Sequence, residues 1–136
     1  MPTRILPTVL IVDDQSSVRN ALRYYFETSG TAECIEAVNG VDGIEKARQS
    51  KPDLVLLDFS MPEMNGLETA KAIKQTNPAI PLIMLTAHVF AAGDLPMRDC
   101  GIEAIFSKYN VAPMIECVRT LLSHGPVPKT QIAKDR

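Results

Sequence analysis

The sequence predicts an α/β fold built on a parallel five-stranded sheet with helices on both of its faces. Three observations lead to this prediction. Five short runs rich in Val, Ile and Leu alternate along the chain with segments of helical character, an order that requires a parallel sheet with right-handed crossovers. One run is apolar on both faces, as a strand inside such a sheet must be. Four runs lead directly into an acid, a lysine or a threonine, and open α/β sheets place ligands at the carboxyl ends of their strands.

The five apolar runs are the expected strands. They lie at residues 8–12, 31–37, 54–58, 80–85 and 103–107. Polar residues interleave in the second run, so this strand is expected at an edge of the sheet. The third run, Leu-Val-Leu-Leu-Asp, is expected in the middle, and Pro52 before it and Pro62 after it favour a strand over a buried helix of the same length.

The intervening segments supply the helices. Four are expected, from about 16 to 29, 41–50, 67–76 and 111–124, the second with its apolar stripe on Val41, Ile44 and Ala47. Ser16 or Ser17 suits the first N-cap, Gly30 is typical of the residue after a helix, and Asn39-Gly40 is expected to turn the chain. The segment 89–100 makes a poor helix because Gly and Pro interrupt it, and Pro costs about 3 kcal/mol inside a helix.

Size and composition narrow the class of protein. The 136 residues are 46% hydrophobic and 22% charged, which is typical of one soluble globular domain. The net charge of −2 argues against binding to nucleic acid or to an anionic membrane. The longest apolar runs are too short to span a bilayer, and no signal peptide opens the chain. We therefore expect a cytoplasmic protein with a lead-in at 1–7, one domain at 8–124, and a tail or the start of a linker at 125–136.

The three cysteines predict neither a disulfide framework nor a metal site. Cys34, Cys100 and Cys117 are odd in number, widely scattered, and without the spacing of metal ligands. They are interpreted as small buried apolar residues in a reducing compartment.

The residues at the ends of the strands carry the chemistry. Asp13 and Asp14 follow the first strand, and Asp58 ends the third. Thr86 follows the fourth strand and Lys108 the fifth, so a parallel sheet brings all five to one edge. Crowded carboxylates repel unless a cation joins them, and oxygen ligands alone suit a hard ion such as Mg²⁺. A lysine and a hydroxyl suit phosphoryl oxygens, so the predicted chemistry is phosphoryl transfer onto Asp58 through an aspartyl phosphate.

In these features the chain resembles the response-regulator receiver domain of bacterial two-component signalling, over about residues 9–122. Four elements in the same order carry the resemblance. They are the acidic pair Asp13-Asp14, the phosphoacceptor signature LLDFSMPEMNG at 56–66, the switch pair Thr86-Ala87, and the lysine Lys108. The resemblance implies a flavodoxin-like three-layer sandwich with strand order 2-1-3-4-5.

The resemblance also implies roles for single residues. Asp58 would accept phosphate from a sensor histidine kinase or a small phosphodonor. Asp14, Asp58 and the backbone carbonyl of Ser60 would ligate Mg²⁺, or Mn²⁺ in its place, with Asp13 acting through water. Thr86, Ala87 and Lys108 would bind the phosphoryl group and change the surface around residues 86–110. Beyond this self-catalysed reaction the chain is not expected to be an enzyme.

Two departures from the family pattern affect the switch rather than the phosphoryl site. Ile105 stands where the family often has Tyr or Phe; Phe106 comes one place later and should face the other side of the sheet. Tyr109 replaces a common Pro after the lysine. Ser60, His88 and Ile105 are candidate modulators of the site, although a solvated loop histidine is the plainer interpretation of His88.

The expected partners are a sensor kinase and an output domain or separate protein, with a homodimer as a further arrangement and no direct contact with nucleic acid or membrane. A pseudo-receiver that binds a partner without taking phosphate is the alternative function. A hydrolase with an aspartate nucleophile would need a D-x-D pattern, which Asp13-Asp14-Gln15 lacks. A flavin carrier would need a phosphate-binding loop after the first strand, and none follows it.

Overall fold

The computed structural model describes residues 6–87 and 101–124. Five strands and four helices are found there: β1 (Thr8–Val12), α1 (Ser16–Thr28), β2 (Glu33–Ala37), α2 (Gly40–Ser50), β3 (Leu54–Asp58), α3 (Gly66–Thr76), β4 (Leu82–Thr86), β5 (Ala104–Ser107) and α5 (Ala112–His124). The strands are parallel in the order β2-β1-β3-β4-β5. The predicted fold class and strand order are thereby confirmed, and the poor helix expected at 89–100 lies outside the described residues.

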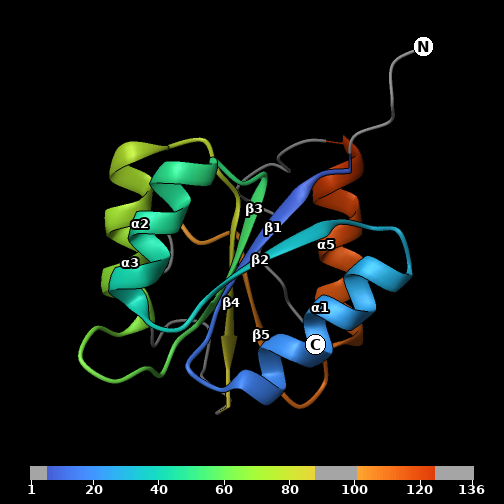
Figure 1. The fold of residues 1–136 in the computed structure, drawn as a ribbon, viewed down its shortest axis with the longest axis horizontal. Coiled ribbons are helices and arrows are strands. Elements are labelled where there is room, and N and C mark those ends of the chain that lie inside the picture. The colour runs from blue at the N-terminus through green and yellow to red at the C-terminus, as the bar shows by residue number, and fades with distance from the viewer. Residues whose placement is uncertain (1–5, 88–100, 125–136) are drawn as a thin grey trace.

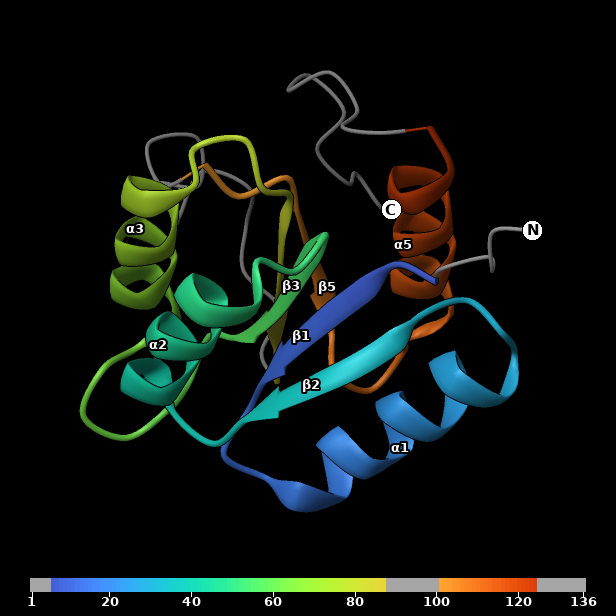
Figure 2. The ribbon, with the colours of Figure 1, turned by 45° about the horizontal axis from the view of Figure 1, so that its top comes forward.

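The sheet separates two hydrophobic cores. Helices α2 and α3 cover one face, and α1 and α5 cover the other (Figures 1 and 2). Every residue of β3 is buried, as expected of the central strand. In β5 the two faces diverge as predicted: Ile105 packs against the core beside α2 and α3, whereas Phe106 packs against the core beside α1 and α5. Among the described residues no helix has the length and apolar character needed to cross a bilayer.

The start of the first helix differs from the prediction. Its N-cap is Gln15, in extended conformation and without a side-chain cap, and not Ser16 or Ser17. The Gln15 N–H donates instead to Asp13 Oδ1 at 2.8 Å, so an acid of the site fixes where the helix begins. At the other end Gly30 follows the C-cap with φ of 73°, as predicted.

The predicted face of α2 is right for Ile44 and Ala47, which pack against the core, and wrong for Val41. Val41 is 63% exposed, and the buried side consists of Gly40, Gly43 and Ala47. A Cβ on Gly43 would come within 2.9 Å of both Val12 methyl groups, so the small residues let the helix lie close to β1. Asn39 caps this helix by accepting a hydrogen bond from the Asp42 N–H and does not simply turn the chain.

The connection from β3 to α3 places the central acid. Asn65 and Glu68 form a capping box at the start of α3, which satisfies two of the free N–H groups of its first turn. A Cβ on Gly66 would lie only 2.7 Å from the Asp58 backbone oxygen, so only glycine fits without a shift. The helix is therefore held directly behind the end of the strand that carries Asp58.

The cysteines are partly covered by the described structure. Cys34 is buried and Cys117 half-buried, both as free thiols, and burial raises the pKa of the Cys34 thiol to about 12. Cys100 lies outside the described residues.

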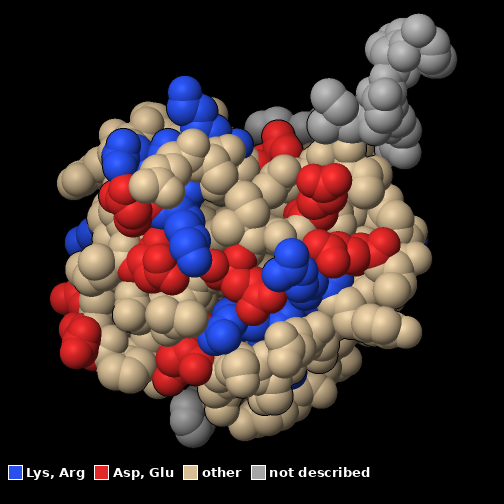
Figure 3. All heavy atoms as spheres, in the orientation of Figure 1, with Lys and Arg blue, Asp and Glu red and all other residues tan. Residues whose placement is uncertain are grey.

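Basic and acidic side chains mingle on the face drawn in Figure 3. Two arginines of α1, Arg19 and Arg23, pair with Glu36 of β2 at 2.8 and 2.7 Å. The described part of this face carries no broad basic patch.

Candidate functional site

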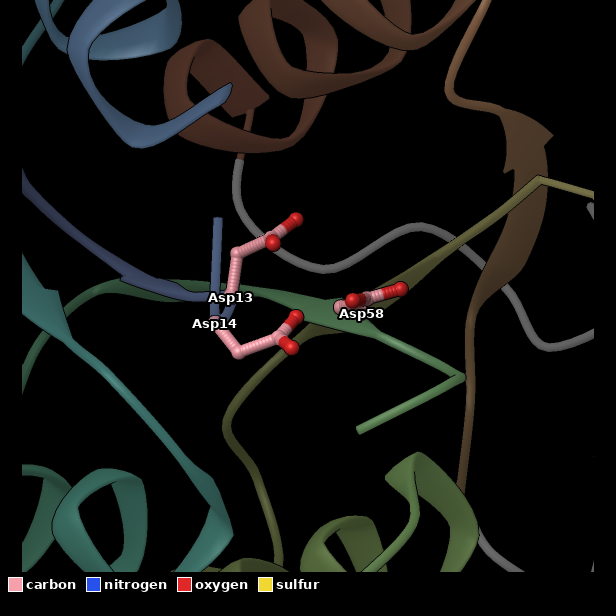
Figure 4. Close-up of side chains that lie close together, drawn as sticks. All are labelled: Asp13, Asp14 and Asp58. Atoms are coloured by element: carbon pink, nitrogen blue, oxygen red, sulfur yellow. The ribbon is translucent and has the colours of Figure 1, made fainter. Parts of the chain in front are cut away.

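Three carboxylates meet at the carboxyl edge of the sheet. Val12 of β1 is in register with Leu57 of β3, so the residues that follow, Asp13 and Asp58, are neighbours. Asp13 is 1% and Asp58 2% exposed, while Asp14 is exposed. Each of the three acids has an oxygen within 4.8 Å of the others, and Figure 4 shows them extending side by side from the ends of β1 and β3. Asp14 is thus the solvent-facing member of the group.

Lys108 reaches the same group from the far side of β4. Its backbone N–H donates to Thr86 O at 2.9 Å, which continues the β4–β5 pairing and fixes the base of the side chain. Its Nζ lies 3.1 Å from Asp13 Oδ2 and 3.3 Å from Asp58 Oδ2, and the side chain is only 9% exposed. A long lysine stem is needed here because β4 separates β5 from β3.

The charges at this edge are unbalanced. Burial, followed by the negative charge of Asp13, raises the pKa of Asp58 to about 6, although Lys108 and the Ser60 N–H favour the ionised form. Burial by itself lowers the pKa of Lys108. The contacts of the ammonium with Asp13 and Asp58 outweigh this effect, so that the lysine pKa is raised. Among the described residues one ammonium thus lies beside a group of three carboxylates, and a further cation would lower the free energy of the ionised group.

The donor set fits a hard divalent cation. Asp13 Oδ2 is buried and has no hydrogen-bond partner among the described residues; Lys108 Nζ is near it, but not at an angle that makes a hydrogen bond. The converging atoms are oxygens, without a histidine or cysteine in the group, as Mg²⁺ and Mn²⁺ prefer. A buried oxygen without a partner and the excess negative charge both suit a bound ion.

The other predicted residues lie around this group. Thr86 ends β4 and is 3% exposed, in register with Ser107 of β5, and Ala87 follows it, half-buried. Ser60 is exposed, and its N–H donates to Asp58 Oδ1 at 3.2 Å. Ile105 is half-buried in the core beside α3. His88 lies outside the described residues.

One residue of the site was not predicted. Gln15 Oε1 accepts a hydrogen bond from Lys108 Nζ at 2.9 Å. The two residues are 93 positions apart, and a glutamine after an acid pair gives no sign of such a contact. The only hint in the sequence is that Gln15 directly follows two acids of the edge.

A parallel sheet of order 2-1-3-4-5 defines a flavodoxin-like fold, and here an acidic group lies at its carboxyl edge. The model of the response regulator receiver domain family matches residues 9–116, and the chain belongs to that family.

Three similar proteins illustrate the range of the family. YhcZ, a transcriptional regulatory protein of Bacillus subtilis, is 36% identical over 118 residues, which are 86% of this chain and 54% of YhcZ. DivK, a polar-differentiation response regulator of Brucella anthropi, is 35% identical over 85% of this chain and 95% of its own. The crystal structure of the response regulator TrrA from Thermotoga maritima, in complex with Mg²⁺ and BeF, has a TM-score of 0.78 and 30% identity over 86% of this chain and 100% of that one. The chain therefore spans about half of one curated relative and nearly all of another.

Proposed function

We propose that this domain is a phosphorylation-controlled switch in which Asp58 accepts a phosphoryl group from a sensor histidine kinase or a small phosphodonor. The observation that carries the proposal is the position of Asp58: at the end of the central strand, beside two further carboxylates and 3.3 Å from the Lys108 ammonium. A carboxylate oxygen of Asp58 attacks the phosphorus and a new O–P bond forms. The bond between phosphorus and the donor breaks, and its electron pair leaves with the donor, as acetate when the donor is acetyl phosphate.

Asp13, Asp14, Asp58 and the backbone carbonyl of Ser60 would hold Mg²⁺, or Mn²⁺ in its place. When bound, the ion supplies positive charge that stabilises the transferring group. The acidic group and the unpartnered Asp13 Oδ2 support this assignment, and the related TrrA was solved with Mg²⁺ and BeF. Lys108, whose Nζ lies 3.3 Å from Asp58 Oδ2, would add a second positive charge.

Phosphorylation of Asp58 would change the conformation of the nearby surface through three residues, Thr86, Ala87 and Lys108. The phosphoryl oxygens would attract the Thr86 hydroxyl and the Lys108 ammonium, and so favour one of two existing conformations by the difference in binding energy. The changed surface around residues 86–110 would then bind an output domain or a separate partner protein. Ser60, His88 and Ile105 remain candidates for setting the lifetime of the switched state.

The domain is proposed to occupy residues 8–124, with 125–136 as a tail or the start of a linker. The relatives are compatible with either arrangement, because the chain spans 54% of YhcZ but 95% of DivK.

Intact-mass measurement after incubation with acetyl phosphate and Mg²⁺ tests the proposal. The wild-type chain should gain the mass of one phosphoryl group, and it should gain none when EDTA replaces Mg²⁺. The variant Asp58→Asn should stay unmodified. A wild-type chain that stays unmodified while Mg²⁺ binds would instead favour the pseudo-receiver, a binding module that never takes phosphate.

A further inference from the structure

Among the described residues, three oxygens lie close to the Lys108 ammonium, and one of them does not belong to an acid. Gln15 Oε1 lies 2.9 Å away with hydrogen-bond geometry, closer than Asp13 Oδ2 at 3.1 Å or Asp58 Oδ2 at 3.3 Å. A lysine ammonium has three N–H donors and no acceptor. The amide oxygen therefore takes one of these donors in a hydrogen bond, whereas the two carboxylate oxygens lie at ion-pair distances.

The backbone of Gln15 is itself held in place. Its N–H donates to Asp13 Oδ1 at 2.8 Å, and its carbonyl accepts from the N–H groups of Val18 and Arg19 at 3.2 Å. The Arg19 guanidinium also donates to the Asp13 carbonyl at 2.8 Å. The glutamine therefore extends from a fixed point between the acid pair and α1, although its own side chain is exposed.

A neutral acceptor suits this place better than a charged one. The edge already has three carboxylates and one ammonium, and a fourth carboxylate would raise the repulsion further. The amide oxygen can hold the lysine without adding charge and without competing with the acids for a cation.

We propose that Gln15 is a positioning residue that holds the Lys108 ammonium between Asp13 and Asp58, ready for the incoming phosphoryl group. This inference rests on the proposed function. The ammonium N–H directed at Asp58 Oδ2 would bind an oxygen of the phosphoryl group on Asp58. The N–H that donates to Gln15 would keep the ammonium in place meanwhile. Gln15 acts through Lys108 and does not itself contact the reacting atoms.

A double-mutant cycle tests the inference, with acetyl phosphate and Mg²⁺ as the probe and intact mass as the readout. Gln15→Met removes the acceptor at nearly the same length. Its second-order rate constant should fall by about three- to tenfold, since hydrogen bonds to charged groups are stronger than neutral ones. In a Lys108→Met background the same change should alter the rate by less than about 1.5-fold, because its effect passes through the lysine.

Gln49→Met is the matched control. The Gln49 side chain likewise makes a hydrogen bond to a charged group, but by donating to the Glu45 carboxylate on the exposed side of α2, so its loss should leave the rate unchanged. An equal loss for Gln15→Met with and without Lys108 would show a merely structural role and overturn the inference. A Gln15→Met rate equal to that of the wild type would do the same.

The lysine ammonium signal in ¹H–¹⁵N NMR gives a readout that needs no phosphorylation. The Lys108 signal should be observable in the wild type and in Gln15→Glu, which keeps an acceptor oxygen, and should broaden beyond detection in Gln15→Met. A signal that persists in Gln15→Met would overturn the inference even if the proposed function stands. A wild type that takes no phosphate but shows this pattern would refute the proposed function alone.

Discussion

The sheet has a buried lysine–carboxylate pair at each of its ends. At the carboxyl end Lys108 lies 3.1 and 3.3 Å from Asp13 and Asp58, and at the amino end Lys74 Nζ lies 3.9 Å from Glu103 Oε2. The two lysine side chains are 9% and 13% exposed. Each end also has a buried carboxylate oxygen, Asp13 Oδ2 or Glu103 Oε1, without a hydrogen-bond partner among the described residues.

The comparison shows which property distinguishes a site from a structural pair. Burial and an unpartnered oxygen are common to both ends, so neither is sufficient. The difference is the balance of charge among the described residues. At the carboxyl end one ammonium lies beside a group of three carboxylates, whereas at the amino end one described carboxylate lies near one ammonium. Only the unbalanced end gains from an added cation.

The largest difference between the ends is expected in phosphorylation. Asp58→Asn should lower the incorporation of phosphate from acetyl phosphate by more than about 100-fold, because it removes the nucleophile. Glu103→Gln, which neutralises the buried acid at the other end, should change the rate by less than about twofold. Intact-mass kinetics measure both, and an equal loss in the two variants would contradict a functional distinction between the ends.

The two neutralisations should change stability in opposite directions in the absence of Mg²⁺. Asp58→Asn should raise the free energy of unfolding near pH 8, by about 3 kcal/mol at most, because burial and Asp13 raise the pKa of Asp58 from 3.8 to about 6. Glu103→Gln should lower it by about 1–2 kcal/mol, since it removes the buried charge that lies 3.9 Å from the Lys74 ammonium. Urea denaturation measures both values.

The pH dependence follows from the same shift. A raised carboxyl pKa in the folded state means that the folded chain binds more protons between about pH 4 and 6. The contribution of Asp58 to stability is therefore fully present below about pH 4 and is lost as the pH rises through 6. The advantage of Asp58→Asn should accordingly vanish near pH 4. Glu63→Gln, at an exposed position in the loop after β3, is the control for the loss of one carboxylate.

Sequence reasoning was most successful where local pattern and topology act together. The burial of β3 follows from an unbroken apolar run, and the meeting of Asp13, Asp58 and Lys108 follows because parallel strands end at one edge. No local signal could reveal the contact between Gln15 and Lys108, whose two residues are 93 positions apart. Such a contact is decided by tertiary structure alone.

The errors in the helices have a similar cause. Hydrophobicity assigned Val41 to the buried face of α2, but close approaches to Thr69 of α3 and to Val12 of β1 leave room there only for Gly40 and Gly43. The serines of α1 are good caps by type, yet the Asp13 carboxylate already takes the Gln15 N–H and sets the helix start one residue earlier. In each case a contact outside the helix outweighed its own sequence.

Magnesium should stabilise the chain through the carboxyl end only. At a free Mg²⁺ concentration of 100 times its Kd, the free energy of unfolding should rise by about 2.7 kcal/mol. Asp14→Asn, at an exposed position, should remove most of this gain without disturbing the core, whereas Glu103→Gln should keep it in full. The gain should also shrink as the pH falls below about 6, where protons compete for Asp58. Thermal melts at matched ionic strength, with Ca²⁺-free buffers, measure each of these effects.

The smallest difference in stability between the two ends is expected at the glycine that lies beside each pair. A Cβ on Gly66 would press against backbone, 2.7 Å from Asp58 O and 2.8 Å from Phe59 Cα, whereas on Gly101 it would meet the side chain of Lys74, 2.8 Å from its Cε. Backbone cannot yield as a flexible lysine can. Gly66→Ala should therefore cost about 2 kcal/mol of stability and also slow phosphorylation, because the strand end that carries Asp58 must shift. Gly101→Ala should cost about 1 kcal/mol, mainly for its positive φ of 74°, and leave the phosphorylation rate unchanged. Equal losses of stability in urea and equal phosphorylation rates for the two variants would contradict this prediction. They would show that the end of β3 tolerates an added methyl group, and that the reactivity of the carboxyl end depends on its charges and not on the packing of Gly66.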